Sequence, residues 1–345
     1  MNSIYRLILV IFLSQSMPVH ADDYVLGHGY DLGSWNISGY TSIEVSLPNR
    51  QAASLTVDDF AIFFHGRVNQ YINPFFEGEY SDQALWTEGD GVLSSGAGHF
   101  LLERLYNDIL FTDALSLRFG KMLAPVGEWN LIHAAPLVAT TTRPLTTYLN
   151  FSEFVTGASL NYVAEQNSNL PSVSVYYQPE QEFLPKPLSS RPYRYKNLAG
   201  IQLVYAHDLD WRAAFSLQHA ELVNRNERQT LFTWDGRYDF DIFSVETQAS
   251  YNQIVGTQPR QRNNEWGGYV QLSVPITEDW SLVGRGETFT GRDAKTSQQN
   301  AVLGVNYRPN TALVWKLEYL LVEGATTGTP PPLNEGLYAS FGVMF

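Results

Sequence analysis

The chain has 345 residues, no cysteine and a formal net charge of −13. The lack of cysteine excludes disulfides and thiolate metal sites, and the negative charge argues against a nucleic-acid partner. Charged residues make up 17% of the chain and aromatic residues 14%, so it is weakly charged and rich in rings compared with average proteins.

The amino-terminal segment has the pattern of a secretory signal peptide. Arg6 precedes an apolar run over 7–13, and Val19 and Ala21 occupy the small-residue positions of a cleavage site. The pattern predicts a signal peptide over 1–21 and a mature chain over 22–345. A membrane anchor is the alternative, but the run is too short to span a bilayer.

Alternation of apolar and polar residues recurs from about residue 34 onward. Near the end of the chain, Leu313, Trp315 and Leu317 take one face of an extended segment while Lys316 and Glu318 take the other. An apolar outside and a polar inside are typical of a transmembrane β-barrel. The pattern predicts sixteen strands over 34–47, 55–66, 69–80, 98–111, 114–122, 153–163, 171–179, 197–206, 210–222, 228–236, 240–253, 265–276, 279–290, 299–308, 311–322 and 336–345.

The connections between these strands alternate in length. Short ones follow even-numbered strands, at 207–210, 277–279 and 308–310. Longer ones follow odd-numbered strands, at 81–97, 122–152, 181–196 and 324–334. Short periplasmic turns and long outer loops produce this asymmetry, so we expect an all-β protein, one antiparallel up-and-down barrel whose long third outer loop folds into the pore.

One segment does not follow the alternation. In 98–111, Glu103 and Asn107 fall on the same face as Leu101 and Leu105, whichever register is chosen. The sequence therefore leaves the regularity of this strand open.

The last strand carries an apolar row to its final residue. Phe341, Val343 and Phe345 lie on one face, which suits lipid and the recognition signal read by the outer-membrane assembly machinery. A core strand of a secreted β-sandwich is the alternative. We expect export to the outer membrane of a Gram-negative bacterium, in contact with its lipid and lipopolysaccharide.

Residues 115–129 resemble the phosphate-selective porin O/P family. The matching positions are Arg118, Gly120, Lys121, Pro125 and Gly127, and segments 57–80 and 230–251 are also similar to that family's paired strands. The resemblance implies a sixteen-stranded channel, with a homotrimer as a further expectation.

The candidate constriction loop departs from that family. Phosphate selectivity there is associated with a ladder of arginines and a cluster of lysines, whereas Arg143 is the single Lys or Arg in 122–152. Glu128 balances it, and His133 adds little positive charge. We therefore expect weak ion preference.

The predicted lumen holds both signs of charge. Candidate pore-lining residues are Arg118, Lys121, Glu128, His133, Arg143, Arg285, Glu287, Lys316 and Glu318, among wall bases that also include Arg67, Arg212, Arg237 and Arg308 and wall acids Glu44, Asp59, Glu77, Glu79, Asp235 and Glu246. Such charges set ion preference at short range. The alternative is that Arg285 pairs with Glu287, and Lys316 with Glu318, across a wet interior.

The sequence predicts a porin for passive diffusion of small hydrophilic solutes and ions. It lacks the G-x-S-x-G and H-E-x-x-H enzyme motifs, and we expect neither a metal nor a cofactor. A calcium site at Glu88 and Asp90 is less expected than an ordinary outer loop. The alternatives are an anion- or phosphate-selective channel, or a barrel that acts as a receptor, adhesin or lipase.

Overall fold

The computed structural model describes residues 24–90, 92, 98–132, 134–166, 168–186, 193–207, 210–223, 225–324 and 334–345. The predicted signal peptide over 1–21 and His133 lie outside the described residues. No helix in the described part of the chain is long and apolar enough to cross a membrane.

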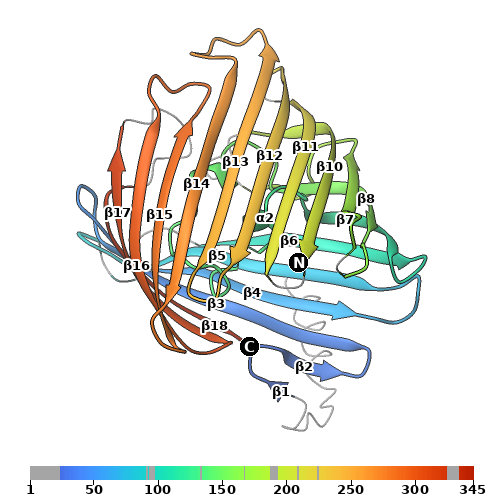
Figure 1. The fold of residues 1–345 in the computed structure, drawn as a ribbon, viewed down its shortest axis with the longest axis horizontal. Helices are drawn as coiled ribbons and strands as arrows, with labels where there is room; N and C mark the ends of the chain where they lie inside the picture. Colours follow the sequence, from blue (N-terminus) through green and yellow to red (C-terminus); the bar gives the residue numbers. More distant parts are fainter. Residues whose placement is uncertain are drawn as a thin grey trace, which may run out of the picture.

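Sixteen antiparallel strands of the described chain form a closed barrel (Figure 1). Each strand pairs with the next in sequence, and the last pairs with the first, Gly342 lying opposite Ser42. This confirms the predicted fold class. The barrel strands are β3 (Trp35–Pro48), β4 (Ser54–Gly66), β5 (Pro74–Thr87), β6 (His99–Leu110), β7 (Leu115–Leu123), β8 (Phe154–Tyr162), β9 (Ser172–Gln178), β10 (Tyr195–His207), β11 (Trp211–Leu222), β12 (Glu227–Asp239), β13 (Ser244–Gly256), β14 (Asn264–Pro275), β15 (Trp280–Thr290), β16 (Gln298–Asn310), β17 (Leu313–Glu323) and β18 (Gly336–Met344).

Two short strands precede the barrel. β1 (Tyr24–Val25) pairs with β2 (Gly29–Leu32), and β2 in turn pairs with the start of β3. The carboxyl end of the chain lies near β2, as Figure 1 shows.

The predicted third strand is displaced. It was expected over 69–80, but β5 covers 74–87. The side chain of Asn69 accepts hydrogen bonds from the backbone N–H groups of Tyr71 and Ile72 at 2.7 and 3.0 Å, which turns the chain before the strand begins. Tyr71 and Ile72 lie in this exposed turn, and their apolar character made the segment resemble a strand in the sequence.

The alternation of faces is confirmed on most strands. Trp315 and Leu317 of β17 are 53% and 45% exposed on the outer surface, whereas Lys316 and Glu318 between and beside them are buried inside. Strands thus present an apolar band outward and polar side chains inward, as lipid and water on opposite sides require.

A β-bulge explains the irregular segment 98–111. The pairing of β5 with β6 skips Glu103, so the alternation shifts by one residue at that point. As a result Leu101 and Glu103 are both buried, while Leu105 is exposed on the outside. No single register fits the segment because the strand contains one extra residue.

The terminal phenylalanine completes the barrel seam. The backbone of Phe345 exchanges hydrogen bonds with Gly39 at 2.7 and 2.9 Å, and its ring stacks on Phe60 with centroids 6.0 Å apart. The ring of Phe341 lies tilted against that of Trp315, with centroids 4.2 Å apart. These contacts join the last strand to its neighbours, whereas the assembly role of Phe345 stays a prediction.

Candidate functional site: the passage beside the third outer loop

The third outer loop, 124–153, enters the barrel and carries the short helices α2 (Glu128–Leu131) and η2 (Leu145–Thr147). Figure 1 shows α2 enclosed within the ring of strands. Gly127 turns the chain into the barrel with φ of 68°, and a Cβ there would lie 2.6 Å from Oε1 of Gln248. Glycine is favoured here because it tolerates the positive φ, whereas the Gln248 side chain could move away from a Cβ.

The two ends of the loop rest on an apolar patch inside the barrel. Ala124, Val126 and Phe151 pack in one buried cluster with side chains of β7 to β12, including Leu198 and Leu231. This patch departs from the predicted polar interior. The loop covers it, so these wall residues are buried, and their burial stabilises the attachment of the loop to the wall.

Three charged side chains of the opposite wall hold the middle of the loop. The carboxylate of Glu318 accepts hydrogen bonds from the backbone N–H groups of Thr141 and Thr142, both at 2.8 Å, and from the Thr142 hydroxyl at 2.6 Å. Arg285 donates to the carbonyl oxygen of Thr142 at 2.8 Å. The ammonium group of Lys316 donates to the carbonyl oxygen of Ala135 at 2.6 Å.

Further polar residues extend this clamp along the wall. The carboxylate of Glu287 accepts from the N–H of Leu145 at 2.8 Å, and Asn252 donates to the carbonyl oxygen of Asn150 at 3.0 Å. Asn306 and Arg308 likewise donate to loop carbonyl oxygens. Residues of β13, β15, β16 and β17 thus satisfy many polar groups of the loop backbone and hold the loop against this wall.

Arg143 forms its contacts within the loop. Its guanidinium pairs with Glu153 at 3.0 Å and donates to the carbonyl oxygen of Thr147 at 2.9 Å. Lys186, from the fourth outer loop over 179–194, also approaches Glu153 at 3.6 Å and pairs with Glu103 at 2.6 Å. The one basic residue of the predicted constriction is therefore neutralised locally.

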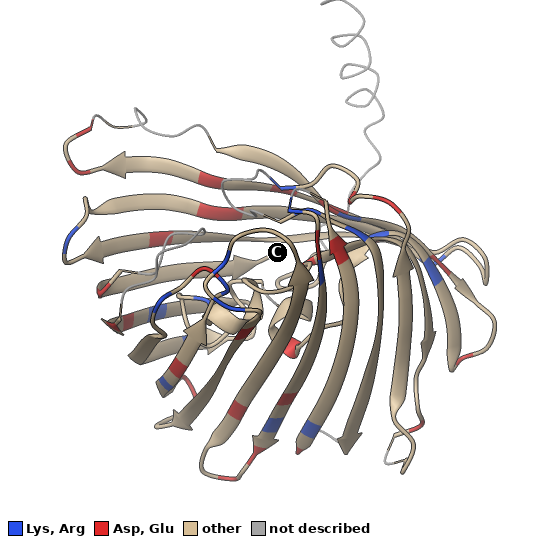
Figure 2. Cartoon of the chain, turned by 90° about the horizontal axis from the view of Figure 1, so that it is seen from above, with Lys and Arg blue, Asp and Glu red and all other residues tan. Residues whose placement is uncertain are grey.

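A cavity remains between this loop and the wall formed by β3, β4 and β5. We call it the passage. On the wall side it is lined by Glu44, Asp58, Asp59 and Glu79, and on the loop side by Trp129, Ala135, Val138, Thr140, Thr141 and Arg143. Figure 2 shows charged residues of both signs on strands and loops of a mostly uncharged chain. The wall of the passage concentrates the acidic ones.

Two further cavities lie beside the loop. One lies between the first half of β3, the second half of β4 and the tip of the loop, where its lining includes Tyr40, Phe63, Leu131 and Leu137. The other lies beside β12 to β14 and shares Trp129 with the passage. Space free of protein atoms thus lies on both sides of the loop.

The predicted site residues do not gather at one place. Arg118 pairs with Asp108 at 2.8 Å on the wall, and Lys121 pairs with Glu182 of the fourth outer loop at 2.8 Å. Burial raises the pKa of the Glu182 carboxyl, against the opposing effect of Lys121. Arg118, Lys121 and Arg143 each have their own acidic partner, so they do not converge on one point.

The remaining predicted residues fall in two groups. Glu128, in α2, approaches Arg212 at 3.5 Å and lines the cavity beside β12 to β14. Arg285 and Glu287 approach each other at 3.6 Å, which agrees with the predicted pair, but their stronger contacts are with the loop. Lys316 and Glu318 also bind the loop. These four wall residues thus bind the loop, and Lys316 also lines the passage.

Sequence reasoning missed three charged residues of the passage, Asp58, Glu153 and Lys186. The register between β3 and β4 shifts at Asp58, which places it beside Asp59 on the same wall. Two consecutive acids in a strand were the available signal, because strict alternation would send one of them to lipid. For Lys186 the sequence contains no such signal, because loops do not show the period-2 alternation of strands.

The closed ring of sixteen strands with a loop held inside is the fold of outer-membrane porins. The chain is similar to OmpF of Salmonella typhi in complex with daunomycin, with a TM-score of 0.64, 13% identity, and coverage of 90% of this chain and 97% of that chain. The chain is also similar to an anion-selective porin from Comamonas acidovorans, with a TM-score of 0.63 and 12% identity. That match covers 90% of this chain and 98% of the porin. A third similar structure is the trimer form of OmpT, an outer membrane protein of Vibrio cholerae, with a TM-score of 0.60 and 13% identity. That match covers 91% of this chain and 99% of the OmpT chain. Neither a protein-family profile nor a curated relative matches the sequence.

Proposed function

We propose that the protein is an outer-membrane channel for passive diffusion of small hydrophilic solutes and ions. One observation carries this proposal. The third outer loop is bound to the wall of β13 to β18, and an open passage is left along β3 to β5. Sixteen strands enclose more space than side chains can fill, and the loop narrows that space without filling it.

The passage has a weak preference for cations. Five acids and three bases line it: Glu44, Asp58, Asp59, Glu79 and Glu153, against Arg143, Lys186 and Lys316. Among the described residues, no basic group lies within ion-pair distance of Glu44, Asp58 or Asp59, whereas the three bases all bind loop or wall oxygens. The field in the passage is therefore negative, and water screens it to a modest strength.

Phosphate is a poor fit to this passage. A phosphate site requires several convergent Lys or Arg donors, and Arg118, Lys121 and Arg143 are separately paired with acids. We propose that the chain does not share the selectivity of the phosphate-selective family that its sequence resembles.

We also propose that the protein is not an enzyme.

Location and assembly follow from the same proposal. The apolar outer band suits the outer membrane of a Gram-negative bacterium, with insertion through the assembly machinery that reads the terminal phenylalanine. A trimeric form of one similar protein supports a homotrimer.

Reversal potentials test the proposed function. Purified protein in a planar bilayer, with a tenfold potassium chloride gradient, is expected to conduct in discrete steps and to give a small reversal potential of the sign set by potassium. A protein that folds and inserts but shows no conductance steps contradicts the channel. A reversal potential of the chloride sign contradicts the ion preference alone.

A further inference from the structure

The cavity between β3, β4 and the tip of the third outer loop has a mostly apolar lining. We call it the apolar cavity. The centre of a water molecule can occupy about 390 Å³ of it. Its apolar lining side chains are Tyr40, Phe63, Leu123, Leu131, Ile132, Ala134, Leu137 and Met344. Since an apolar cavity of about 150 Å³ already binds benzene, this one has room for an aromatic ring.

The tip of the loop exposes apolar side chains inside the barrel. Leu131, Ile132 and Leu137 are 36%, 43% and 49% exposed, and all three line the apolar cavity. Because the loop lies within the ring of strands, these side chains face the lumen and not lipid. Apolar surface in contact with water is unfavourable, so an apolar part of a solute that covers it gains affinity.

The apolar cavity carries no strong net charge of its own. Its two charged residues, Glu77 and Arg104, pair with each other. The Arg104 guanidinium also lies over the rings of Phe63 and Phe75, 5.5 and 4.6 Å from their centres. The cavity therefore suits the uncharged part of a solute better than an ionic group.

The acidic wall of the passage begins beside this cavity. Tyr40 lines the apolar cavity, and its hydroxyl donates to Glu79 of the passage at 3.2 Å. Ser42, which lies opposite Asp59, is two residues beyond Tyr40, about 7 Å along the strand. A solute with an apolar body and a charged group a few ångströms apart therefore contacts the cavity and the passage at once.

Charge complementarity decides the sign of that charged group. Glu44, Asp58 and Asp59 line the passage, and no basic group lies within ion-pair distance of them among the described residues. Lys316 lines the passage too, but it donates to the carbonyl oxygen of Ala135. A cation is therefore attracted to this wall more strongly than an anion.

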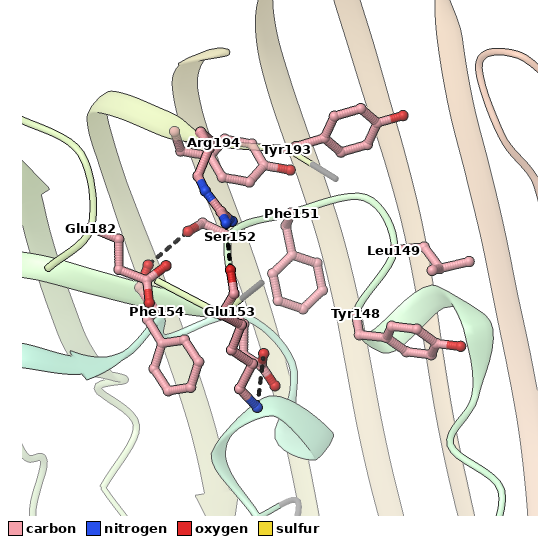
Figure 3. A pocket seen from close by; sticks show the side chains of 11 residues that line it. Tyr148, Leu149, Phe151, Ser152, Glu153, Phe154, Glu182, Tyr193 and Arg194 are labelled. Carbon is pink, nitrogen blue, oxygen red and sulfur yellow. Dashed lines mark hydrogen bonds and ion pairs between the residues drawn. The ribbon is translucent and has the colours of Figure 1, made fainter. Parts of the chain in front are cut away.

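We propose that the channel admits amphiphilic organic cations, which bind with the ammonium group at the acidic wall of the passage and the apolar body in the apolar cavity. The inference rests on the proposed channel function and names a solute class for it. Such a body does not fit the gap between the third and fourth outer loops, which Figure 3 shows with Phe151 and Tyr193. There the centre of a water molecule has only about 30 Å³, room for about two waters.

Block of the potassium current tests this solute class. Phenethylammonium chloride, ethylammonium chloride and 2-phenylethanol are added in turn to single channels in a planar bilayer with symmetric potassium chloride. Phenethylammonium has the charge and the ring, whereas the other two have the charge alone or the ring alone. It is expected to reduce the current with saturable kinetics, at about tenfold lower concentration than either of them, because it makes both contacts.

Leu137→Asn removes exposed apolar surface from the cavity. The half-blocking concentration of phenethylammonium should rise by about fivefold, while that of ethylammonium stays the same. Leu137→Met keeps an apolar side chain and should restore the lower concentration. Leu149→Asn is the matched control, because it makes the same change in the same loop but lines the small gap of Figure 3. It should leave both concentrations unchanged.

Three results would overturn the proposal. Equal block by phenethylammonium and ethylammonium would exclude the apolar contact, and stronger block by phenylacetate than by phenethylammonium would exclude the preference for a cation. Unchanged block of Leu137→Asn by phenethylammonium would exclude the apolar cavity as the place of the ring. The potassium chloride current persists in all three, so they differ from a protein that inserts without conductance steps, which contradicts the channel itself.

Discussion

The two sides of the lumen use charged residues in opposite ways. On β15 and β17, Arg285, Lys316 and Glu318 are buried and bind the third outer loop. On β3 and β4, Glu44 and Asp59 face the passage and have no ion pair among the described residues. Apart from the bulge at Asp58, both walls show the same alternation of polar and apolar residues in the sequence.

The difference teaches that a charged residue facing a lumen does not necessarily act on permeating ions. On β15 and β17, which we call the clamping wall, the charged side chains donate to or accept from the loop backbone, so they contribute to the position of the loop. We call the wall of β3 and β4 the open wall. Charges on the open wall are left to contribute to the electric field. Substitutions on the two walls should therefore have different effects on the same channel.

Removal of Phe345 is expected to have the largest effect, because neither wall exists without a closed barrel. The deletion removes the backbone pairing with Gly39 and the ring contact with Phe60. Folded, heat-modifiable protein in the outer membrane should fall strongly, and Phe345→Tyr should retain most of it. Normal folded yield of the deletion variant would argue against the assembly role.

Shortening the third outer loop is expected to have the next largest effect. Replacing residues 134–142 by two glycines removes the segment that lies between the clamping wall and the passage. Single-channel conductance should rise by about twofold, since the loop no longer narrows the lumen. An unchanged conductance in a variant that folds would place the constriction elsewhere.

Glu318→Ala should release the loop without shortening it. The substitution removes the acceptor of three hydrogen bonds, at a cost of roughly 1–3 kcal/mol. We expect larger fluctuations of the open-channel current and a lower midpoint for thermal unfolding. Glu323→Ala, at the exposed outer end of the same strand, is the control. An open-channel current in Glu318→Ala that fluctuates no more than in the unmodified protein would show that the remaining contacts are enough to hold the loop.

Asp58→Asn with Asp59→Asn changes the open wall and is expected to have a smaller effect. Two acids in water at a few ångströms from a passing ion contribute about 1 kcal/mol each at most. The ratio of potassium to chloride permeability should fall by about threefold, while conductance and stability change little. Asp241→Asn, in the exposed turn between β12 and β13, should leave the ratio unchanged. A loss of stability instead would mean that these acids belong to a buried network.

Much of the fold follows from the sequence because period-2 alternation survives in nearly every strand. It identified β17 and its lipid-facing row correctly. It failed at Glu103 and Asp58, where a bulge adds one residue and shifts the faces. It also failed at Tyr71, whose apolar character belongs to a turn.

The site was less predictable than the fold. Which wall residues would clamp the loop depends on the path of the loop, and that path depends on contacts between segments far apart in sequence. Glu318 and Thr142 are separated by 176 residues, yet the hydroxyl of one lies 2.6 Å from the carboxylate of the other. Side-chain type alone does not distinguish such a clamp from a charge that faces open water.

Phosphate is expected to have the smallest effect of all. Its binding would need several cations at one point, whereas Arg118, Lys121 and Arg143 are held apart by Asp108, Glu182 and Glu153. Moving Arg118 or Lys121 toward a phosphate would break its ion pair with Asp108 or Glu182, and moving Arg143 would leave Glu153 with the longer contact to Lys186 alone. A single screened contact to phosphate does not offset that cost.

Chloride current should therefore be insensitive to low concentrations of phosphate, and Arg143→Gln should respond to phosphate as the unmodified protein does. Sulfate at the same concentration is the control for divalent anions in general. Strong saturable block by phosphate, relieved by Arg143→Gln, would show that these bases rearrange around the anion. The distinction between a clamping wall and an open wall would then hold only for the empty channel.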